Sequence, residues 1–365
     1  MHNKITVTSP SLPDLKDFTK SLEQIWDNKW LTNAGPFHQE LENKLAAYLG
    51  VPYISLFSNG TLGLITAIQA LQLEGEIITT PYSFVATAHS IWWNKLKPVF
   101  VDTDPVYGNL CPEKIEAAIT PKTTAIMPVH VYGHPCELEK IKLIAEKYNL
   151  KIIYDAAHAF GVKYNGESIL NWGDLSVLSF HATKVFNTIE GGAIVSHTAE
   201  MKKHIDYLKN FGFEDETTVM EIGINAKMNE IQAAFGLLQL DKINENINKR
   251  KNIYNHYHQE LSQIKGIRLI SPKENVTYNY SYYPILIDEK EYGMTRDELY
   301  FHLQKNNIFA RRYFYPLITA FEPYKNHFTK HFDHASKIAD KVICLPMYAE
   351  LTESDVKYIL NIIKQ

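Results

Sequence analysis

The sequence has few cysteines and no long apolar run, and both absences exclude whole classes of protein. Three cysteines stand among 365 residues, at positions 111, 136 and 344, which are odd in number and far apart. A disulfide framework or a zinc site would need a different spacing, so we expect reduced, packed thiols and no metal. Nowhere do 18 apolar residues run together, and residues 1–16 lack the apolar segment of a secretory signal. We therefore expect a cytoplasmic protein that does not contact a membrane.

The chain also lacks an excess of charge of either sign. Lys and Arg number 37 against 41 Asp and Glu, and no block of like charge occurs, so a nucleic-acid partner is not expected. No G-x-G-x-x-G turn follows an early strand, which argues against a nucleotide-binding dehydrogenase. The chain is long and rich in apolar residues. Its 365 residues, 45% of them hydrophobic, are enough for two domains, each with its own core.

Apolar periodicity in the first half predicts alternating helices and strands. Phe37, Leu41, Leu45 and Leu49 recur every four residues from Pro36 and predict a helix that Gly50 ends. Short apolar runs then alternate with helical segments, as expected for a wound, mainly parallel α/β sheet. The expected strands are 53–57, 76–80, 98–102, 123–133 and 151–155, and the expected helices are 61–73, 85–93, 112–119 and 137–148.

The pattern changes in the second half. Three further strands are expected, those at 174–180 and 191–197 among them, before a long helical pattern from about residue 228 to about residue 261. Beyond it, strands at 266–271 and 280–287 and helices at 295–307 and 353–364 predict a smaller α+β arrangement. We therefore expect a large α/β domain over 1–240 and a small domain over 241–365, linked by the long helix.

Polar residues that follow apolar strand runs are the candidates for a site, because ligands of open α/β sheets lie beyond the carboxyl ends of the strands. Gly60 and Thr61 follow one strand and open a helix, where backbone N–H groups can hold a phosphate. An ordinary capped helix start is the alternative. Asp155 ends another strand, and a carboxylate buried there needs a basic side chain or a protonated ring nitrogen as its partner. His158, three residues on, could reach the same ligand or serve the structure alone.

Lys184 closes the segment SFHATK after the strand at 174–180. A lysine among apolar neighbours loses pKa and becomes a nucleophile, although most lysines are solvated surface charges. A phosphate turn, a carboxylate for a pyridinium nitrogen, the hydroxyl of Ser179 and a lysine that can bond an aldehyde are what pyridoxal 5′-phosphate (PLP) requires of a protein. The combination predicts a PLP enzyme, with pyridoxamine phosphate as the aminated form of the cofactor.

These residues resemble the DegT/DnrJ/EryC1/StrS sugar aminotransferases, a branch of the fold-type I PLP-dependent transferases. The likeness covers nearly the whole chain and lies in WLTNAGP (30–36), TPYSFVAT (80–87), DAAH (155–158), SFHATK (179–184) and EGG (190–192). A further motif, GINAKMNEIQAA (223–234), departs from the family in one place. Lys227 stands where arginine is frequent, so a bidentate contact there would be lost while the charge remained.

The resemblance implies roles for the site residues. Lys184 would bond the cofactor aldehyde and Asp155 would hold its ring nitrogen protonated. His158 would lie near the phenolic oxygen of the cofactor, and Phe84 would stack on its ring. The phosphate would be bound by the remaining set: Gly60, Thr61, Ser179 and, from the partner subunit of a homodimer, Asn225.

The resemblance further implies transfer of an amino group from L-glutamate to the 4-keto group of a dTDP-linked 6-deoxyhexose, for surface polysaccharide such as O-antigen. Amination at carbon 3, or of a UDP- or GDP-linked sugar, stays open. The segment 310–316 resembles the one that approaches the sugar nucleotide, so Arg312 and Tyr315 are candidate substrate contacts, although packing alone would also explain them. A PLP-fold sensor without turnover is the alternative outside catalysis.

Overall fold

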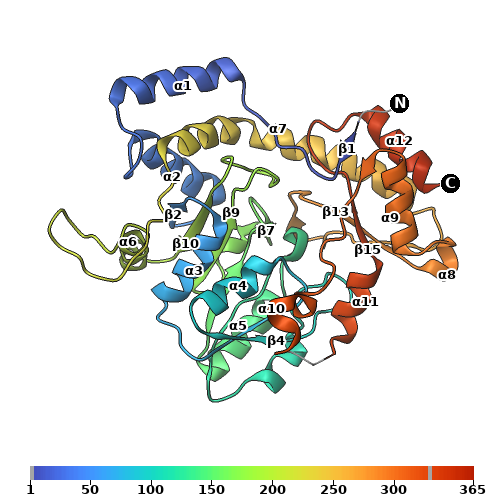
Figure 1. Ribbon diagram of the computed structural model, residues 1–365, viewed down its shortest axis with the longest axis horizontal. Helices are drawn as coiled ribbons and strands as arrows, with labels where there is room; N and C mark the ends of the chain where they lie inside the picture. The colour runs from blue at the N-terminus through green and yellow to red at the C-terminus, as the bar shows by residue number, and fades with distance from the viewer. Residues whose placement is uncertain (1–3, 328–330) are drawn as a thin grey trace.

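The structure, a computed structural model, describes residues 4–327 and 331–365. A seven-stranded sheet forms its centre (Figure 1). Strand β10 runs antiparallel to both its neighbours, and the other strands run parallel to one another, which confirms the mainly parallel wound sheet. In spatial order the strands are β2 (Tyr53–Phe57), β10 (Gly192–Ser196), β9 (Leu175–Ser179), β6 (Lys151–Asp155), β5 (Thr123–Ile126), β3 (Glu76–Thr79) and β4 (Lys97–Phe100).

Successive side chains of each strand point to opposite faces of the sheet, and both faces are covered by helices. In β6, Ile152 and Tyr154 enter one apolar core while Ile153 enters another. The first core is shared with α2 (Pro36–Leu49), α5 (Leu138–Tyr148) and α7 (Glu230–Leu261). The second is shared with α3 (Gly60–Ala70), α4 (Val85–Trp93) and α6 (Ala199–Leu208).

Several parts of the first half differ from the expectation, and the strand expected over 123–133 ends at Ile126. Residues 112–119 form two short 3-10 turns, η1 (Pro112–Lys114) and η2 (Glu116–Ala118), instead of a helix. The segment is short, and Pro121 disfavours helical backbone at the residue before it. Helix α1 (Leu15–Asn28) was not predicted, although Leu15, Phe18, Leu22 and Ile25 recur at helical spacing; of these residues only Ile25 is buried.

The C-terminal part has its own sheet of β11 (Ile267–Leu269), β13 (Tyr283–Ile287) and β15 (Val342–Leu345). The N-terminal strand β1 (Ile5–Thr6) joins this part by pairing with β14 (Ile308–Phe309). Helix α7 runs unbroken past residue 240 and spans both parts (Figure 1), so the domain division at 240/241 stays a prediction. The other elements here are α8 (Glu289–Tyr292), α9 (Arg296–Lys305), α10 (Glu322–Lys325), α11 (Asp333–Lys341), α12 (Glu353–Ile363) and η5 (Ile318–Ala320).

Smaller elements complete the chain. Strands β7 (Lys163–Tyr164) and β8 (Glu167–Ser168) form a hairpin that β12 (Val276–Thr277) extends. The single turns η3 (Val131–Gly133) and η4 (Ile169–Asn171) follow β5 and β8. The segment between α6 and α7 projects from the body of the molecule (Figure 1). Across residues 4–327 and 331–365, none of the helices combines the length and the apolar character that a membrane crossing requires.

Candidate active site

Lys184 lies just beyond the carboxyl end of β9, in a loop that returns the chain to β10. Its amine is shielded from solvent, and this desolvation lowers the pKa of Lys184 from 10.5 to about 8, although the charge of Asp155 acts in the opposite direction. The Nζ atom lies 3.5 Å from the hydroxyl of Tyr282. A lysine with so low a pKa has an appreciable neutral fraction near neutral pH and can act as a nucleophile and a base.

Asp155 ends β6, the strand beside β9, so the parallel sheet places both residues at the same edge. Its buried carboxylate accepts hydrogen bonds from Thr87 Oγ1 at 2.7 Å and from the backbone N–H of Ala157 at 3.2 Å. Burial raises the pKa of Asp155, and those two hydrogen bonds and the charge of Lys184 offset part of the rise. Within the described residues this carboxylate forms no ion pair, so it can receive a cationic partner from a ligand.

His158 is buried beside the same two residues. Its Nδ1 accepts a hydrogen bond from the backbone N–H of Tyr132 at 3.2 Å, and its ring contacts Tyr282 and stacks on Phe314. Burial, with a further contribution from the charge of Lys184, holds the pKa of His158 well below its usual 6.5. The ring is therefore neutral, and because Nδ1 accepts, the proton lies on Nε2 and can be donated to a ligand.

The turn at Gly60 lies against the end of β9. A Cβ added to Gly60 would come within 3.1 Å of Ser179 Cβ and 3.3 Å of the Leu178 carbonyl oxygen, so only glycine fits without displacement. Asn59 caps α3 by accepting from the N–H of Leu62 at 2.9 Å. Because the first N–H groups of a helix have no acceptor in the helix, those of Gly60 and Thr61 can bind an anion next to Ser179.

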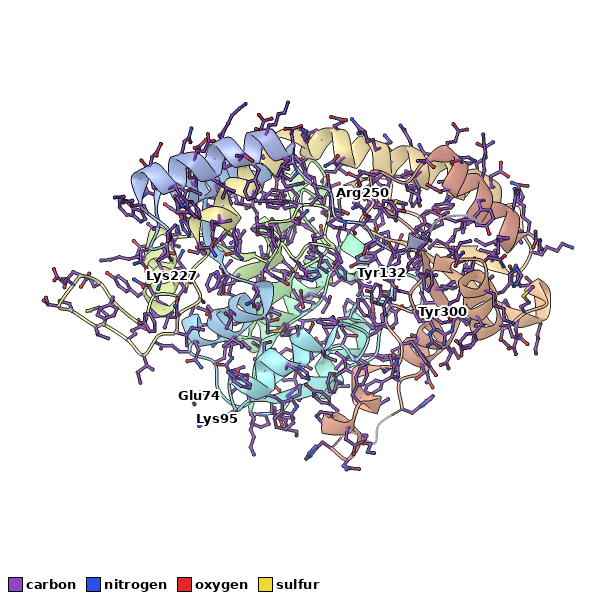
Figure 2. The ribbon with its side chains drawn as sticks, turned by 45° about the horizontal axis from the view of Figure 1, so that its top comes forward. Glu74, Lys95, Tyr132, Lys227, Arg250 and Tyr300 are labelled. Atoms are coloured by element: carbon purple, nitrogen blue, oxygen red, sulfur yellow. The ribbon has the colours of Figure 1, made fainter. Side chains whose placement is uncertain are left out.

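Two further candidates, Phe84 and Asn225, are exposed residues. Phe84 precedes α4, the helix that carries Thr87, and the residue is 60% exposed. Asn225 is exposed in the projecting segment, where it pairs with Asn210, and no described contact joins it to Lys184. The neighbouring Lys227 donates to Asn210 Oδ1 at 2.7 Å, and Figure 2 places it at the end of the molecule away from Tyr300.

The candidate substrate contacts, Arg312 and Tyr315, already interact with other residues of the C-terminal part. Arg312 Nη1 pairs with Asp297 at 2.8 Å, and its guanidinium lies over the rings of Tyr300 and Tyr315. The next two residues are the ones that reach the site, because the ring of Tyr313 contacts Tyr282 and that of Phe314 stacks on His158. A substrate role for Arg312 and Tyr315 stays a prediction.

The sequence reasoning missed two residues of this site, Thr87 and Tyr282. Thr87 is the last residue of the TPYSFVAT motif, and a threonine in the first turn of the expected helix could have been noticed there. Tyr282 stands in a tyrosine-rich run that reads only as a strand. Its contact with Lys184 depends on how the C-terminal part packs against the sheet, which no local pattern records.

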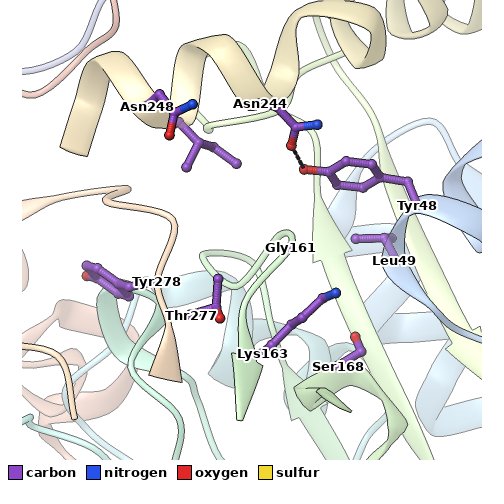
Figure 3. A pocket seen from close by; sticks show the side chains of 10 residues that line it. Tyr48, Leu49, Gly161, Lys163, Ser168, Asn244, Asn248, Thr277 and Tyr278 are labelled. Carbon is purple, nitrogen blue, oxygen red and sulfur yellow. Dashed lines mark hydrogen bonds between the residues drawn. The ribbon is translucent and has the colours of Figure 1, made fainter. Parts of the chain in front are cut away.

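A separate cavity of about 430 Å³ lies between α2, α7 and the β7–β8 hairpin (Figure 3). Lys163 is the one charged residue of its lining, and neither Lys184 nor Asp155 belongs to it. Tyr48 from α2 and Asn244 from α7 close one side through a hydrogen bond of 2.8 Å. The cavity therefore has neither the amine nor the carboxylate that a PLP site needs.

Comparison with known proteins gives consistent matches along the chain. The sequence pattern of the DegT/DnrJ/EryC1/StrS aminotransferase family matches residues 14–364. A dTDP-4-amino-4,6-dideoxy-D-glucose transaminase from Shigella dysenteriae is 56% identical over 366 residues, which is 100% of both chains. The structure of DesI in the presence of its TDP-sugar product has a TM-score of 0.96 at 33% identity, covering 100% of this chain and 93% of DesI. The structure of NtdA from Bacillus subtilis with bound cofactor PMP has a TM-score of 0.88 at 27% identity, covering 96% and 82%.

Proposed function

Because the chain belongs to the DegT/DnrJ/EryC1/StrS aminotransferase family, we propose that it aminates carbon 4 of a dTDP-linked 4-keto-6-deoxyhexose with L-glutamate as donor. The product would be dTDP-4-amino-4,6-dideoxyglucose, a precursor for surface polysaccharide such as O-antigen. The observation that carries the proposal is the match to the Shigella transaminase, which at 56% identity spans the whole of both chains.

The residues fit the PLP cofactor of the family. A buried carboxylate without an ion pair, Asp155, suits a protonated ring nitrogen, and the neutral His158 can donate from Nε2 to the phenolic oxygen. The α3 start at Gly60 and Thr61, with Ser179 beside it, suits the phosphate. When bound, PLP supplies the electron sink that stabilises the carbanion formed at the donor's α-carbon.

The chain itself supplies the base and the electrostatic environment. Lys184, with a pKa of about 8, would take the proton from the α-carbon of the donor in the first half-reaction, and in the second half-reaction the same amine would deliver a proton to the sugar carbon. Asp155 would keep the ring nitrogen of the cofactor protonated, so that a positive charge faces the electron density that develops. This is the electrostatic part of the catalysis. Two half-reactions that share one lysine predict ping-pong kinetics.

The projecting segment supports a homodimer with shared sites. Its residues Val219, Met220, Ile222 and Ile224 are exposed, Ile222 almost completely at 98%. An apolar arm of this kind favours burial against a second protein surface. We propose that it carries Asn225 to the cofactor phosphate of the partner subunit, and that Phe84 stacks on the cofactor ring within its own subunit. Three free, buried cysteines fit a reducing compartment, so we further propose the cytoplasm.

Three experiments test the proposed function. Purified protein should show the yellow absorption of bound PLP, and L-glutamate should bleach it; a sensor without turnover would not bleach. The protein, L-glutamate and a panel of 3-keto and 4-keto sugars linked to dTDP, UDP or GDP should give the amino product from the dTDP-linked 4-keto sugar. Amination of another member of the panel in its place contradicts the substrate, and a Lys184→Ala variant with substantial transaminase activity contradicts the site.

A further inference from the structure

Tyr282 approaches the amine of Lys184 from the C-terminal part of the chain. Its hydroxyl oxygen lies 3.5 Å from Lys184 Nζ, which also lies 5.9 Å from the centroid of the Tyr282 ring. Tyr282 is buried, and burial holds the pKa of its hydroxyl above 10.0. The phenol therefore stays neutral at physiological pH, where it can accept a hydrogen bond from the ammonium form of Lys184 or donate one to the free amine.

The carbonyl oxygen of Tyr132 fixes the backbone that presents Tyr282. It accepts hydrogen bonds from the hydroxyls of Tyr278 at 2.7 Å and of Ser281 at 2.6 Å. Both donors are buried, so each hydrogen bond would be costly to leave unmade. The segment that leads to Tyr282 is thus anchored on η3, which follows β5 beyond the carboxyl ends of the strands of the seven-stranded sheet.

Asn279 adds a second anchor on the loop after Asp155. Its side-chain N–H groups donate to the carbonyl oxygens of His158 at 2.8 Å and Phe160 at 3.0 Å. The next residue, Tyr280, has a φ of 54°, a left-handed conformation that a bulky side chain adopts only under constraint. Such local strain persists where the surrounding contacts over-determine the backbone, and it gathers at functional sites.

We propose that Tyr282 is a positioning residue, whose hydroxyl receives the ε-amine of Lys184 whenever that amine is not bonded to the cofactor. The inference rests on the proposed function and deepens it, because a transaminase lysine must leave the cofactor and rejoin it in every cycle. A long side chain released from a covalent bond has many rotamers, and one fixed partner keeps it facing the site. A separation of 3.5 Å is the outer limit of a hydrogen bond, which suits a partner that must let the amine go.

The chain offers a matched control in the adjacent residue. Tyr283 is also buried, but its hydroxyl has no hydrogen-bond partner among the described residues, and its ring packs on Tyr254 and Tyr257 in the C-terminal core. Tyr282→Phe and Tyr283→Phe each remove one buried hydroxyl. Only the first removes the group that contacts Lys184.

The first measurement is trace acetylation of the cofactor-free protein with acetic anhydride between about pH 6 and about pH 10, followed at the Lys184 peptide by mass spectrometry. Tyr282→Phe should make Lys184 react about two- to threefold faster at neutral pH, because loss of the acceptor and of a polar neighbour lowers the pKa of the amine by about half a unit. Tyr283→Phe should leave the curve unchanged. A Tyr282→Phe curve that superimposes on the wild type overturns the proposal.

The second measurement is steady-state kinetics of the PLP-loaded enzyme. Tyr282→Phe should lower kcat about tenfold with KM for the nucleotide sugar unchanged, and unchanged kcat overturns the proposal. Should Tyr282→Phe not fold, Tyr278→Phe keeps the Tyr282 hydroxyl, loosens its anchor and should shift the labelling curve in the same direction by a smaller factor; an unshifted curve then overturns the role. The labelling needs neither cofactor nor sugar, so a wild type that aminates no sugar overturns the proposed function alone.

Discussion

The hydroxyl of Thr87, on α4, donates a hydrogen bond of 2.7 Å to the carboxylate of Asp155, at the end of β6. The contact joins a helix on one face of the sheet to the residue proposed to hold the cofactor nitrogen. Ser83 extends this hydrogen-bonded chain, because its hydroxyl lies 2.8 Å from that of Thr87. Since Asp155 is buried and has no ion pair among the described residues, this hydrogen bond is one of the few interactions that favour its charged form.

Thr87→Val should therefore weaken the site without disturbing the core. Valine keeps the shape of threonine but removes the donor, so the pKa of Asp155 should rise further above its ordinary value and its grip on a protonated ring nitrogen should loosen. We expect kcat to fall about tenfold and PLP to bind less tightly, measured by kinetics and by cofactor titration. Thr66→Val is the control, because the Thr66 hydroxyl is buried without a hydrogen-bond partner in the described chain. Equal losses in the two variants would contradict the role of Thr87.

The shielded amine of Lys184 predicts a pH-dependent stability. Its pKa falls from 10.5 to about 8 on folding, so below pH 8 both folded and unfolded chains carry the charge, and the folded chain bears the full penalty of shielding it. Between about pH 8 and about pH 10.5 the folded chain binds fewer protons than the unfolded one, and the penalty fades as the pH rises.

Lys184→Met should accordingly stabilise the cofactor-free protein by up to about 3 kcal/mol at neutral pH, and the gain should shrink towards about pH 10.5. Urea unfolding at several pH values measures it. Lys251→Met, at an exposed position of α7, should change the unfolding free energy little at any pH. A gain that does not vary with pH would show that the amine is not shielded.

The strands of the central sheet could be predicted from the sequence better than the elements that surround them. Apolar runs such as 53–57 and 151–155 are buried on both faces, so each reads as a strand whatever lies around it. The pairing of β1 with β14 involves two residues on each side, some 300 positions apart, which is too short a pattern to recognise.

The residues of the candidate site likewise fall into those that the sequence could predict and those that it could not. Lys184 and Asp155 could be placed together from the sequence, since Asp155 ends β6, Lys184 follows the end of the neighbouring parallel strand β9, and such ends meet at one edge. Tyr282 could not, because it reaches Lys184 across the interface between the two parts of the chain. Arg312 shows the reverse case, in which a residue type suited to a diphosphate is already paired with Asp297. Local pattern indicates which strand end a residue occupies, and packing decides what it meets.

Glu230, the first residue of α7, provides a prediction about stability. Its buried carboxylate accepts from the backbone N–H groups of Phe37 at 2.9 Å and His38 at 2.8 Å, and so caps the start of α2 from another part of the chain. Glu230→Ala leaves both N–H groups without this acceptor and should lower the unfolding free energy by about 2–3 kcal/mol. Glu40→Ala removes an exposed carboxylate paired with Lys44 and should cost less than about 1 kcal/mol in the same urea titration. Similar losses would show that the cap contributes nothing.

The proposed sharing of sites between subunits can be decided by mixing two defective variants. Lys184→Ala removes the amine, and Asn225→Ala removes the proposed contact of the projecting segment with the partner's phosphate site. If Asn225 acts across the dimer, a mixed dimer contains one site with Lys184 and Asn225 both intact, supplied by different chains.

Refolding the two variants together in equal amounts should then restore about a quarter of wild-type activity, because half of the dimers are mixed and each has one intact site. If Asn225 acts within its own subunit, every site that keeps Lys184 lacks Asn225, and the mixture stays at the mean of the two variants. Mixing Lys184→Ala with Lys184→Met is the control, since neither chain supplies the amine and no activity should return.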